Sequence, residues 1–273
     1  MKRSGRRDLS ALLLQKKYGS RKEGRGMAKR ILKALNALVD FAVIFALLLA
    51  GAYSVYALWD NGRIYTAAEN VREEMLKLKP GQANGCSFDE LRKINPDICA
   101  WLTLDNTQID YPILQGDDNI AYLNTDVYGE FALAGSIFLD YRNDRSFRDG
   151  YSLLYGHHMD RNKMFGDLDL YKDESFFSVN RSGTLMTNGR AYRIDVFACV
   201  VTTASDEMFF EPQDTVIGQM LDHVLKNALC VDRETAEKVR SSDGRMQILA
   251  MSTCSSDYTD ARTVVLAAME PQL

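Results

Sequence analysis

The sequence predicts a mainly β fold: a closed eight-stranded β-barrel with N-terminal helices and one inserted helix before the penultimate strand, preceded by a single transmembrane helix. Three observations predict this fold. Eight short apolar or alternating runs are separated by Gly, Asn and Asp clusters without long helices between them, one later segment has helical spacing, and one 19-residue run carries no charge. The eight runs are residues 98–104, 109–114, 134–138, 151–155, 184–187, 192–201, 246–253 and 263–268.

The chain begins with a strongly basic segment. Its first 33 residues hold 12 Lys and Arg against 2 acidic residues, although the 273-residue chain has a formal net charge of −4. The rest of the chain is therefore acidic, which excludes a basic phosphate-binding surface, and we expect no nucleic-acid partner. The positive-inside rule keeps the basic segment in the cytoplasm, so residues 1–37 are expected to form a cytoplasmic tail.

The uncharged run at residues 41–59 is long enough for a membrane helix. At about 1.5 Å per residue it spans roughly 28 Å, close to the thickness of the hydrocarbon core. Tyr53, Tyr56 and Trp59 suit the outer interface of a bilayer. We therefore expect residues 38–59 to be a single-pass signal anchor in the cell membrane, with the C-terminal domain extracellular.

Two alternatives to a retained anchor are open. The run could be a buried core helix, or a signal peptide cleaved at Ala50-Gly51-Ala52, which has the small-residue form of a cleavage site. The long basic segment and the apolar residues that continue after residue 52 favour retention.

Helical segments follow the anchor. Residues 60–86 are expected to form a helical stalk, because residues 65–78 have helical spacing and end at a Lys-Pro-Gly stop signal. Ser87 and Glu90 form a capping box, which predicts a short helix that ends near Asn95-Pro96.

The barrel is expected within residues 87–273. Residues 215–228 repeat apolar side chains at helical spacing and predict the one inserted helix. The chain has no Gly-rich phosphate loop and no Cys-x-x-Cys metal knuckle, and the acidic pair Asp117-Asp118 is typical of a solvated loop. We therefore expect no cofactor and no metal.

The number of cysteines is odd, so at least one is unpaired. In an extracytoplasmic domain a free thiol is a candidate nucleophile, and the alternative for each cysteine is a buried, inert side chain. The five cysteines are Cys86, Cys99, Cys199, Cys230 and Cys254.

Cys254 and Arg262 flank a predicted hairpin loop. If the strands on either side pair in antiparallel fashion across the seven-residue connection, the two residues lie side by side at one mouth of the barrel, with Cα atoms about 5 Å apart. A guanidinium group favours the thiolate of a neighbouring cysteine and can hold an oxyanion.

The chain has three histidines. His157 and His158 follow the predicted strand 151–155, whereas His223 lies in the inserted helix and is expected to be a surface or packing residue. A histidine at the end of a third strand could move the proton that acyl transfer requires. Spacing alone leaves the alternative open that Cys254 is a small buried side chain, Arg262 a solvated charge and the histidine pair incidental.

The motifs around these residues resemble those of sortases, the membrane-anchored cysteine transpeptidases of Gram-positive bacteria. Ser252-Thr253-Cys254 with Arg262, and Leu154-Tyr155-Gly156-His157, are similar to the sortase signature. The likeness covers residue 65 to the C-terminus, with one departure, because Ala250-Met251 replaces the Thr-Leu of the family motif. Class B is indicated by Asn95-Pro96-Asp97-Ile98, Ile109-Asp110-Tyr111-Pro112-Ile113, Gln115-Gly116-Asp117-Asp118-Asn119, the run from Gly135 to Asn143, and Met164-Phe165-Gly166.

The resemblance implies a reaction and a set of site residues. Cys254 would attack a threonine carbonyl in the C-terminal sorting signal of a secreted protein, and His157, which follows Tyr-Gly as in the family, would serve as the general acid and base. Arg262 would stabilise the oxyanion or the substrate, and an amine of a cell-wall precursor or of a pilin would resolve the thioester. The resemblance also implies a substrate-binding role for Asn119, Leu123, Ser252, Thr253 and Tyr258.

Two other functions are compatible with the same residues. A cysteine peptidase or amidase would form the same thioester but release its product to water. A membrane-anchored binding module would contain Cys254 as an inert thiol. The sorting motif, the acceptor and the oligomeric state are left open.

Overall fold

The computed structural model describes the backbone of residues 5–242, 244–255 and 257–272. In the first helix it describes the side chains of residue 16, of residues 25–27 and from residue 29 onward. Residues 1–4 of the predicted tail lie outside the described residues. The chain divides into two compact units, Met1–Asn61 and Gly62–Leu273.

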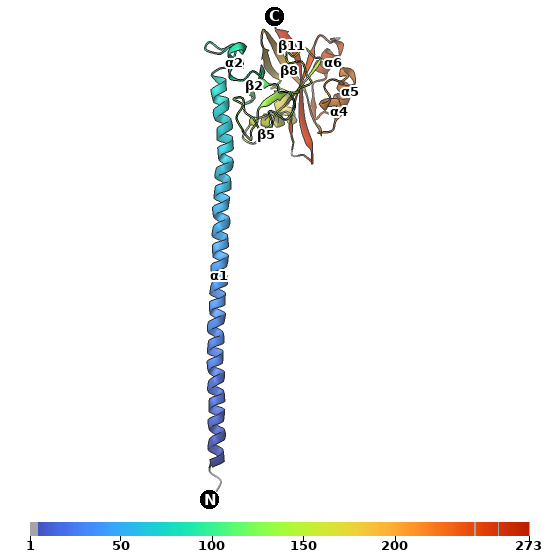
Figure 1. Ribbon diagram of the computed structural model, residues 1–273. Helices are drawn as coiled ribbons and strands as arrows, with labels where there is room; N and C mark the ends of the chain where they lie inside the picture. The colour runs from blue at the N-terminus through green and yellow to red at the C-terminus, as the bar shows by residue number, and fades with distance from the viewer. Residues whose placement is uncertain (1–4, 243, 256, 273) are drawn as a thin grey trace. The chain divides into compact units, whose positions relative to one another are not determined.

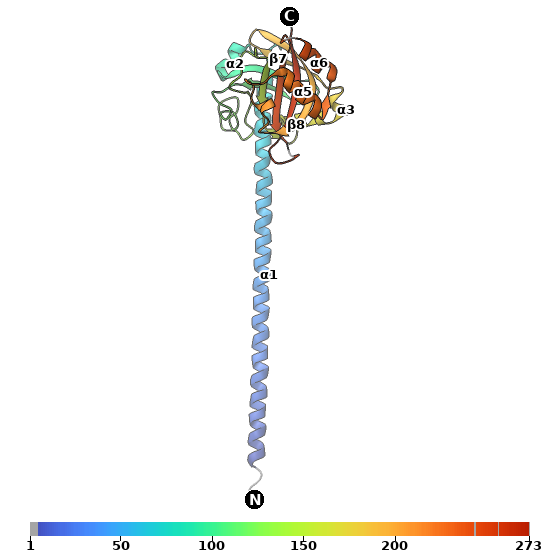
Figure 2. The same ribbon diagram turned by 90° about the vertical axis from the view of Figure 1, so that its right-hand side faces the viewer.

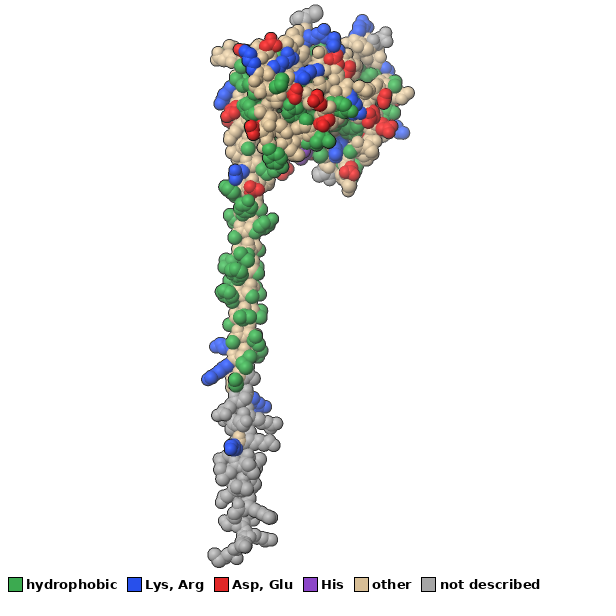
Figure 3. Space-filling view, in the orientation of Figure 1, with side chains coloured by type: hydrophobic (Ala, Val, Ile, Leu, Met, Phe, Trp, Pro, Cys, Tyr) green, Lys and Arg blue, Asp and Glu red, His purple; other side chains and the backbone are tan. Residues whose placement is uncertain are grey.

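Helix α1 (Gly5–Leu76) runs without a break through the predicted tail and anchor and ends within the predicted stalk. Part of it is long and apolar enough to cross a membrane, and none of that apolar window is buried. Hydrophobic side chains line this part of the helix on the face that Figure 3 shows, and Phe41, Leu48 and Leu58 are among the exposed ones. The exposure of these side chains argues against the core-helix alternative, because a core helix buries its apolar residues.

Helix α2 (Phe88–Ile94) begins where the sequence predicts. The Ser87 side chain accepts a hydrogen bond from the Glu90 backbone, and the Glu90 carboxylate accepts one from the Ser87 backbone, which completes the capping box. Its buried residues Phe88 and Leu91 pack with Met75, in the last turn of α1, and with Trp101 of the barrel.

Eight strands form a closed barrel, as the sequence predicts (Figures 1 and 2). Their order is β11-β10-β4-β3-β2-β1-β7-β8, and pairing of β8 with β11 closes the ring. The strands are β1 (Ile98–Leu104), β2 (Asp110–Leu114), β3 (Ile137–Leu139), β4 (Tyr151–Tyr155), β7 (Ser182–Thr187), β8 (Arg190–Thr203), β10 (Gln247–Cys254) and β11 (Ala261–Gln272).

Both faces of several strands are buried, which explains why they read as continuous apolar runs. In β10, Leu249 and Met251 belong to the cluster that fills the barrel. Ile248 and Ala250 point to the other face and pack against the helices on the outside of the barrel. Ala250 and Met251 replace the Thr-Leu of the family motif. Met251 therefore lies inside the barrel, and Ala250 lies in the buried layer under the outer helices.

The prediction of one inserted helix is incomplete. The expected helix is α5 (Ile217–Asn227), but the short α4 (Glu207–Phe210) and a second full helix, α6 (Arg233–Ser241), lie on the same face of the barrel (Figure 1). Helix α6 buries only Thr235, Ala236 and Val239 and is polar elsewhere, so it contains few of the apolar residues that mark a helix in a sequence. The Asp232 side chain, which accepts from the Glu234 backbone, was the available signal for its start.

Several short elements were not predicted. The hairpin β5 (His158–Met159) and β6 (Lys163–Met164) is followed by the 3₁₀ helix η1 (Gly166–Lys172) and by α3 (Glu174–Phe177). Strand β9 (Cys230–Val231) extends the sheet beyond β8 without entering the closed ring. Figure 1 shows β5 and the tip of the red β10–β11 hairpin at the same end of the barrel.

Candidate active site

The β10–β11 hairpin places the predicted nucleophile beside the predicted arginine. Cys254 and Arg262 are direct register partners in the antiparallel pair, as the loop length predicts. Cys254 is exposed, and the preceding residues Ser252 and Thr253 are buried. A thiol therefore stands at the open end of a strand that is otherwise in the core, with a guanidinium group on the neighbouring strand.

His157 comes to the same end of the barrel along a third strand. Strand β4 runs parallel to β10, with Tyr155 paired to Ser252, and the Gly156 backbone donates to the Ser252 carbonyl at 3.2 Å. His157 is two residues beyond Tyr155, as Cys254 is two residues beyond Ser252. The topology thus brings the three predicted catalytic residues to three adjacent strand ends.

The His157 ring is held by a backbone carbonyl. Its Nε2 lies 2.7 Å from the carbonyl oxygen of Leu123. Because a carbonyl only accepts hydrogen bonds, Nε2 carries the proton, and in the neutral ring Nδ1 has the lone pair. The ring is therefore oriented with Nδ1 as the nitrogen that can exchange a proton.

The loop that supplies this carbonyl is fixed by a close backbone approach. Gly135 has φ +59°, and a Cβ atom there would lie 2.4 Å from the Leu123 carbonyl oxygen. Next to it, the Ser136 backbone donates to the Tyr122 carbonyl at 3.0 Å. Only glycine combines this backbone conformation with the contact, so Gly135 determines where the Leu123 carbonyl lies.

A buried carboxylate ties the same loop to the barrel. Asp140 accepts five hydrogen bonds: three from Arg142, at 2.9–3.0 Å, one from the Asn119 amide at 2.8 Å and one from the Tyr155 hydroxyl at 3.0 Å. Burial alone would raise the pKa of Asp140, but the hydrogen bonds from Arg142 and Asn119 hold it below its ordinary value. Asp140 thus links the loop that contains Leu123 to β4.

The predicted substrate-binding residues have different surroundings. Asn119 is engaged within the protein, because its amide also accepts from the Tyr141 backbone at 3.1 Å. Ser252 and Thr253 are buried, and no hydrogen-bond partner is found for either hydroxyl among the described residues. The Tyr258 side chain is 46% exposed. The sequence does not indicate a role for Asp140 or for the Leu123 carbonyl. Asp140 and Arg142 are only two residues apart, which is not a recognisable motif, and the position of a backbone oxygen cannot be read from a sequence.

Three of the other four cysteines are buried and poorly suited to be nucleophiles. All five are free, and Cys254 is the exposed one. Burial raises the pKa of Cys99 to about 12 and that of Cys230 to about 11, and it also raises the pKa of Cys199.

The third histidine, His223, has its own partners on the outside of the barrel. His223 packs edge-on against Phe209 and pairs with Asp206 at 3.4 Å, as expected of a packing residue. Among the residues that the structure describes, no group of three or more His, Cys, Asp or Glu side chains could hold a metal ion.

Comparisons with known proteins agree on one family. The sortase domain model matches residues 102–270. Sortase B of Listeria monocytogenes is 32% identical over 245 residues, which cover 86% of this chain and 97% of that protein. Sortase B of Staphylococcus aureus is 33% identical over 199 residues, which cover 71% of this chain and 79% of that protein.

Solved structures show the same likeness. The class B sortase Spy0129 of Streptococcus pyogenes, which is involved in pilus biogenesis, superposes with a TM-score of 0.59 at 39% identity and covers 67% of this chain and 97% of that one. Sortase B of Clostridium perfringens has a TM-score of 0.59 at 30% identity and covers 67% of this chain and 99% of that one.

Proposed function

We propose a mechanism for this chain from one premise: the chain belongs to the sortase family, and within it to class B, so it is a sortase transpeptidase. In this mechanism Cys254 is the nucleophile, His157 the general acid and base, and Arg262 the stabiliser of the oxyanion. The observation that supports it most is the register pair of Cys254 and Arg262 at the end of β10, with His157 at the end of the adjacent parallel strand.

In the first half-reaction the Cys254 thiolate adds to the carbonyl carbon of a scissile amide in a C-terminal sorting signal. The negative charge moves to the carbonyl oxygen, where the Arg262 guanidinium stabilises it. The C–N bond then breaks, His157 gives its proton to the leaving amine, and a thioester to Cys254 is left.

In the second half-reaction an acceptor amine attacks the thioester. His157, now neutral, takes a proton from the amine, the C–S bond breaks, and Cys254 leaves as the thiolate. The Leu123 carbonyl supports both steps, because it keeps the proton on Nε2 and holds the orientation of the ring. Proton exchange therefore takes place at Nδ1.

The acceptor is an amine of the cell wall or of a pilin. Two solved relatives support this choice: Spy0129 is involved in pilus biogenesis, and a sortase B has been solved in complex with triglycine, a peptide with a free amine. Hydrolysis of the same thioester by water is the competing outcome, since it uses the same Cys254 and His157 chemistry.

We place the protein in the cell membrane as a single-pass protein, with the N-terminal tail in the cytoplasm and the catalytic domain outside. The apolar part of α1 supports the anchor, and the excess of Lys and Arg before it supports the orientation. This location would put the domain beside secreted proteins and cell-wall precursors, which are the proposed partners.

Product analysis tests the proposal. Full-length protein in detergent is incubated with a position-scanning library of fluorescence-quenched peptides, with and without triglycine or a lysine-containing peptide, and the products are identified by mass spectrometry. We expect cleavage of a subset of peptides and formation of a new amide bond when an amine is present.

Two variants serve as controls. Cys254→Ala should give neither product, whereas Cys86→Ala, which alters a half-buried cysteine, should react like the wild-type protein. Products that contain only the free acid, at every amine concentration, would indicate a peptidase. The absence of cleavage over the whole library would contradict the proposed activity.

A further inference from the structure

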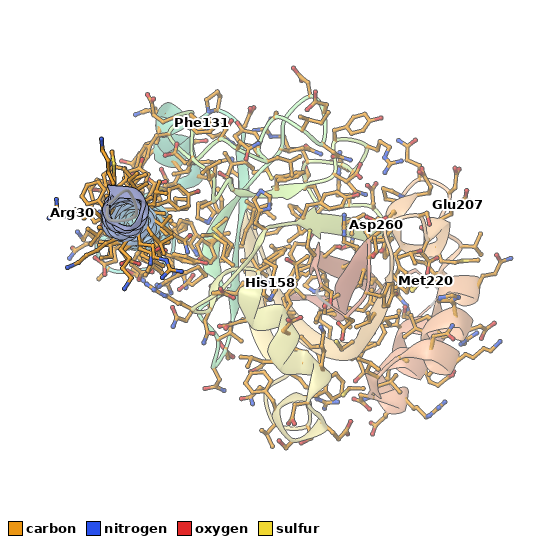
Figure 4. The ribbon with its side chains drawn as sticks, turned by 90° about the horizontal axis from the view of Figure 1, so that it is seen from below. Arg30, Phe131, His158, Glu207, Met220 and Asp260 are labelled. Carbon is orange, nitrogen blue, oxygen red and sulfur yellow. The ribbon has the colours of Figure 1, made fainter. Side chains whose placement is uncertain are left out.

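The 3₁₀ helix η1 carries a charged pair beside the predicted active site. Asp169 and Lys172 are three residues apart, which puts them on one face of a helix with three residues per turn. The Lys172 Nζ atom lies 2.9 Å from Asp169 Oδ1. In Figure 4, His158 lies next to the yellow helical segment of η1.

This pair contacts three segments of the chain. Asp169 Oδ2 lies 3.0 Å from His158 Nε2, and Asp169 Oδ1 accepts a hydrogen bond from Thr263 Oγ1 at 3.0 Å. Lys172 Nζ donates to Ser255 Oγ at 2.9 Å. One ion pair therefore joins β5, the start of β11 and the loop after β10.

Each of the three contacts is made by the residue that directly follows a predicted catalytic residue. His158 follows His157, Ser255 follows Cys254, and Thr263 follows Arg262. Neighbouring side chains of a strand point to opposite faces, so contacts of Thr263 fix the backbone and leave Arg262 on the other face. The ion pair can thus set the separation of the three groups without touching the substrate.

Helix η1, which carries this pair, is anchored in the barrel core. Its Leu168 and Tyr171 side chains are fully buried in the cluster that fills the barrel. Lys172 also donates to Asp257 in the β10–β11 loop at 2.6 Å, and this hydrogen bond lowers the pKa of the Asp257 carboxyl. The Lys172 ammonium group, which has three partners, therefore links the loop after Cys254 to the barrel core.

We propose that Asp169 and Lys172 are positioning residues that hold the chain segments of Cys254, His157 and Arg262 at their working distances. This inference rests on the proposed function for those three residues. It predicts that removal of the Lys172 charge lowers the turnover rate more than the loss of stability explains. The reason is that misplacement of a catalytic group by about 1 Å lowers the rate about 100-fold.

The test compares Lys172→Met with Lys79→Met in the full-length protein. Lys79 is a matched control, since its Nζ also bridges a carboxylate and a hydroxyl, Asp110 and Thr103, and its side chain is 15% exposed against 20% for Lys172. Three quantities are measured: kcat and KM with the best library peptide, the rate at which a methanethiosulfonate reagent modifies Cys254, and the midpoint of unfolding.

We expect Lys172→Met to lower kcat about 10- to 100-fold with little change in KM, and to slow the modification of Cys254, because His157 and Arg262 lose their positions relative to the sulfur. Lys79→Met should lower the midpoint of unfolding about as much as Lys172→Met does, and it should leave kcat and the modification rate of Cys254 unchanged. Lys172→Arg, which keeps the charge and the donors, should restore most of the lost rate.

Two results would overturn the inference: wild-type rates in Lys172→Met, or an equal loss of rate in Lys79→Met, which would indicate a merely structural role. If the wild-type protein cleaves no peptide, the proposed function fails separately. The modification rate of Cys254 then decides the positioning role on its own, since it needs no substrate.

Discussion

Removal of the Arg142 guanidinium should destabilise the barrel strongly, because Arg142 is the cation that faces a buried carboxylate. The Asp140 side chain has no exposed surface, and the Arg142 side chain is 19% exposed. In Arg142→Ala the carboxylate would keep the hydrogen bonds from Asn119, from Tyr155 and from the backbone of residue 142, but would lose two charge-assisted ones.

The size of the effect follows from the burial of Asp140. Breaking a buried ion pair from one side costs about 3–5 kcal/mol, since the remaining charge is left uncompensated. The pairing of Arg142 with the half-exposed Glu211 adds little. In a domain of this size, each kcal/mol of lost stability lowers Tm by about 2–4 °C. The expected fall in Tm is therefore about 6–20 °C.

The effect should depend on pH. In the wild-type protein the pKa of Asp140 lies below its ordinary value, so the carboxylate adds stability at neutral pH that is lost as the pH falls through the folded-state pKa. In Arg142→Ala burial becomes dominant and raises this pKa, so the charge destabilises the fold until acid neutralises it. The difference in stability between the two proteins should therefore be largest near pH 7 and smaller near pH 4.

Urea unfolding at several pH values, followed by the fluorescence of the buried Trp101, measures this difference. Arg145→Ala is the matched control, because Arg145 pairs with Asp97 at 3.7 Å but is 41% exposed, and it should cost less than about 1 kcal/mol. A loss below about 1 kcal/mol for Arg142→Ala, or a loss that does not change with pH, would refute the reasoning.

Three further predictions concern the site and the anchor. Gly135→Ala should displace the Leu123 carbonyl from the His157 ring and lower kcat about 10- to 100-fold, as measured by peptide cleavage, and wild-type turnover would contradict this role of the carbonyl. Arg262→Lys should lose about 2–4 kcal/mol of transition-state stabilisation in kcat with a smaller change in KM, whereas near-normal turnover of Arg262→Ala would remove this residue from the mechanism. Protease treatment of intact cells should release the C-terminal domain, and a mature N-terminus at Tyr53 would instead indicate a cleaved signal peptide.

The closed barrel could be predicted because its signals are local. Each of the eight strands is an apolar run bounded by turn residues, and the capping box at Ser87 marks the start of α2. The pairing of Cys254 with Arg262 follows from the loop length once the two strands pair in antiparallel fashion. These features depend on neighbouring residues, which a sequence shows directly.

The supporting contacts could not be predicted because they depend on distant segments. Asp140 collects donors from Asn119 and Tyr155, and Asp169 contacts Thr263, which is 94 residues away in the sequence. Helix α6 was missed because it is polar and short, although Asp232 marks its start. Only the closed barrel brings these groups together.

The central claim is that Cys254 carries the acyl group between two amines. The most direct measurement is the intact mass of the full-length protein, quenched in acid during turnover of a library peptide, followed by mapping of the adduct. We predict a mass increase equal to the acyl fragment, located on Cys254, lost on addition of triglycine and absent in Cys254→Ala. An adduct on another cysteine, or turnover by Cys254→Ala, would contradict it.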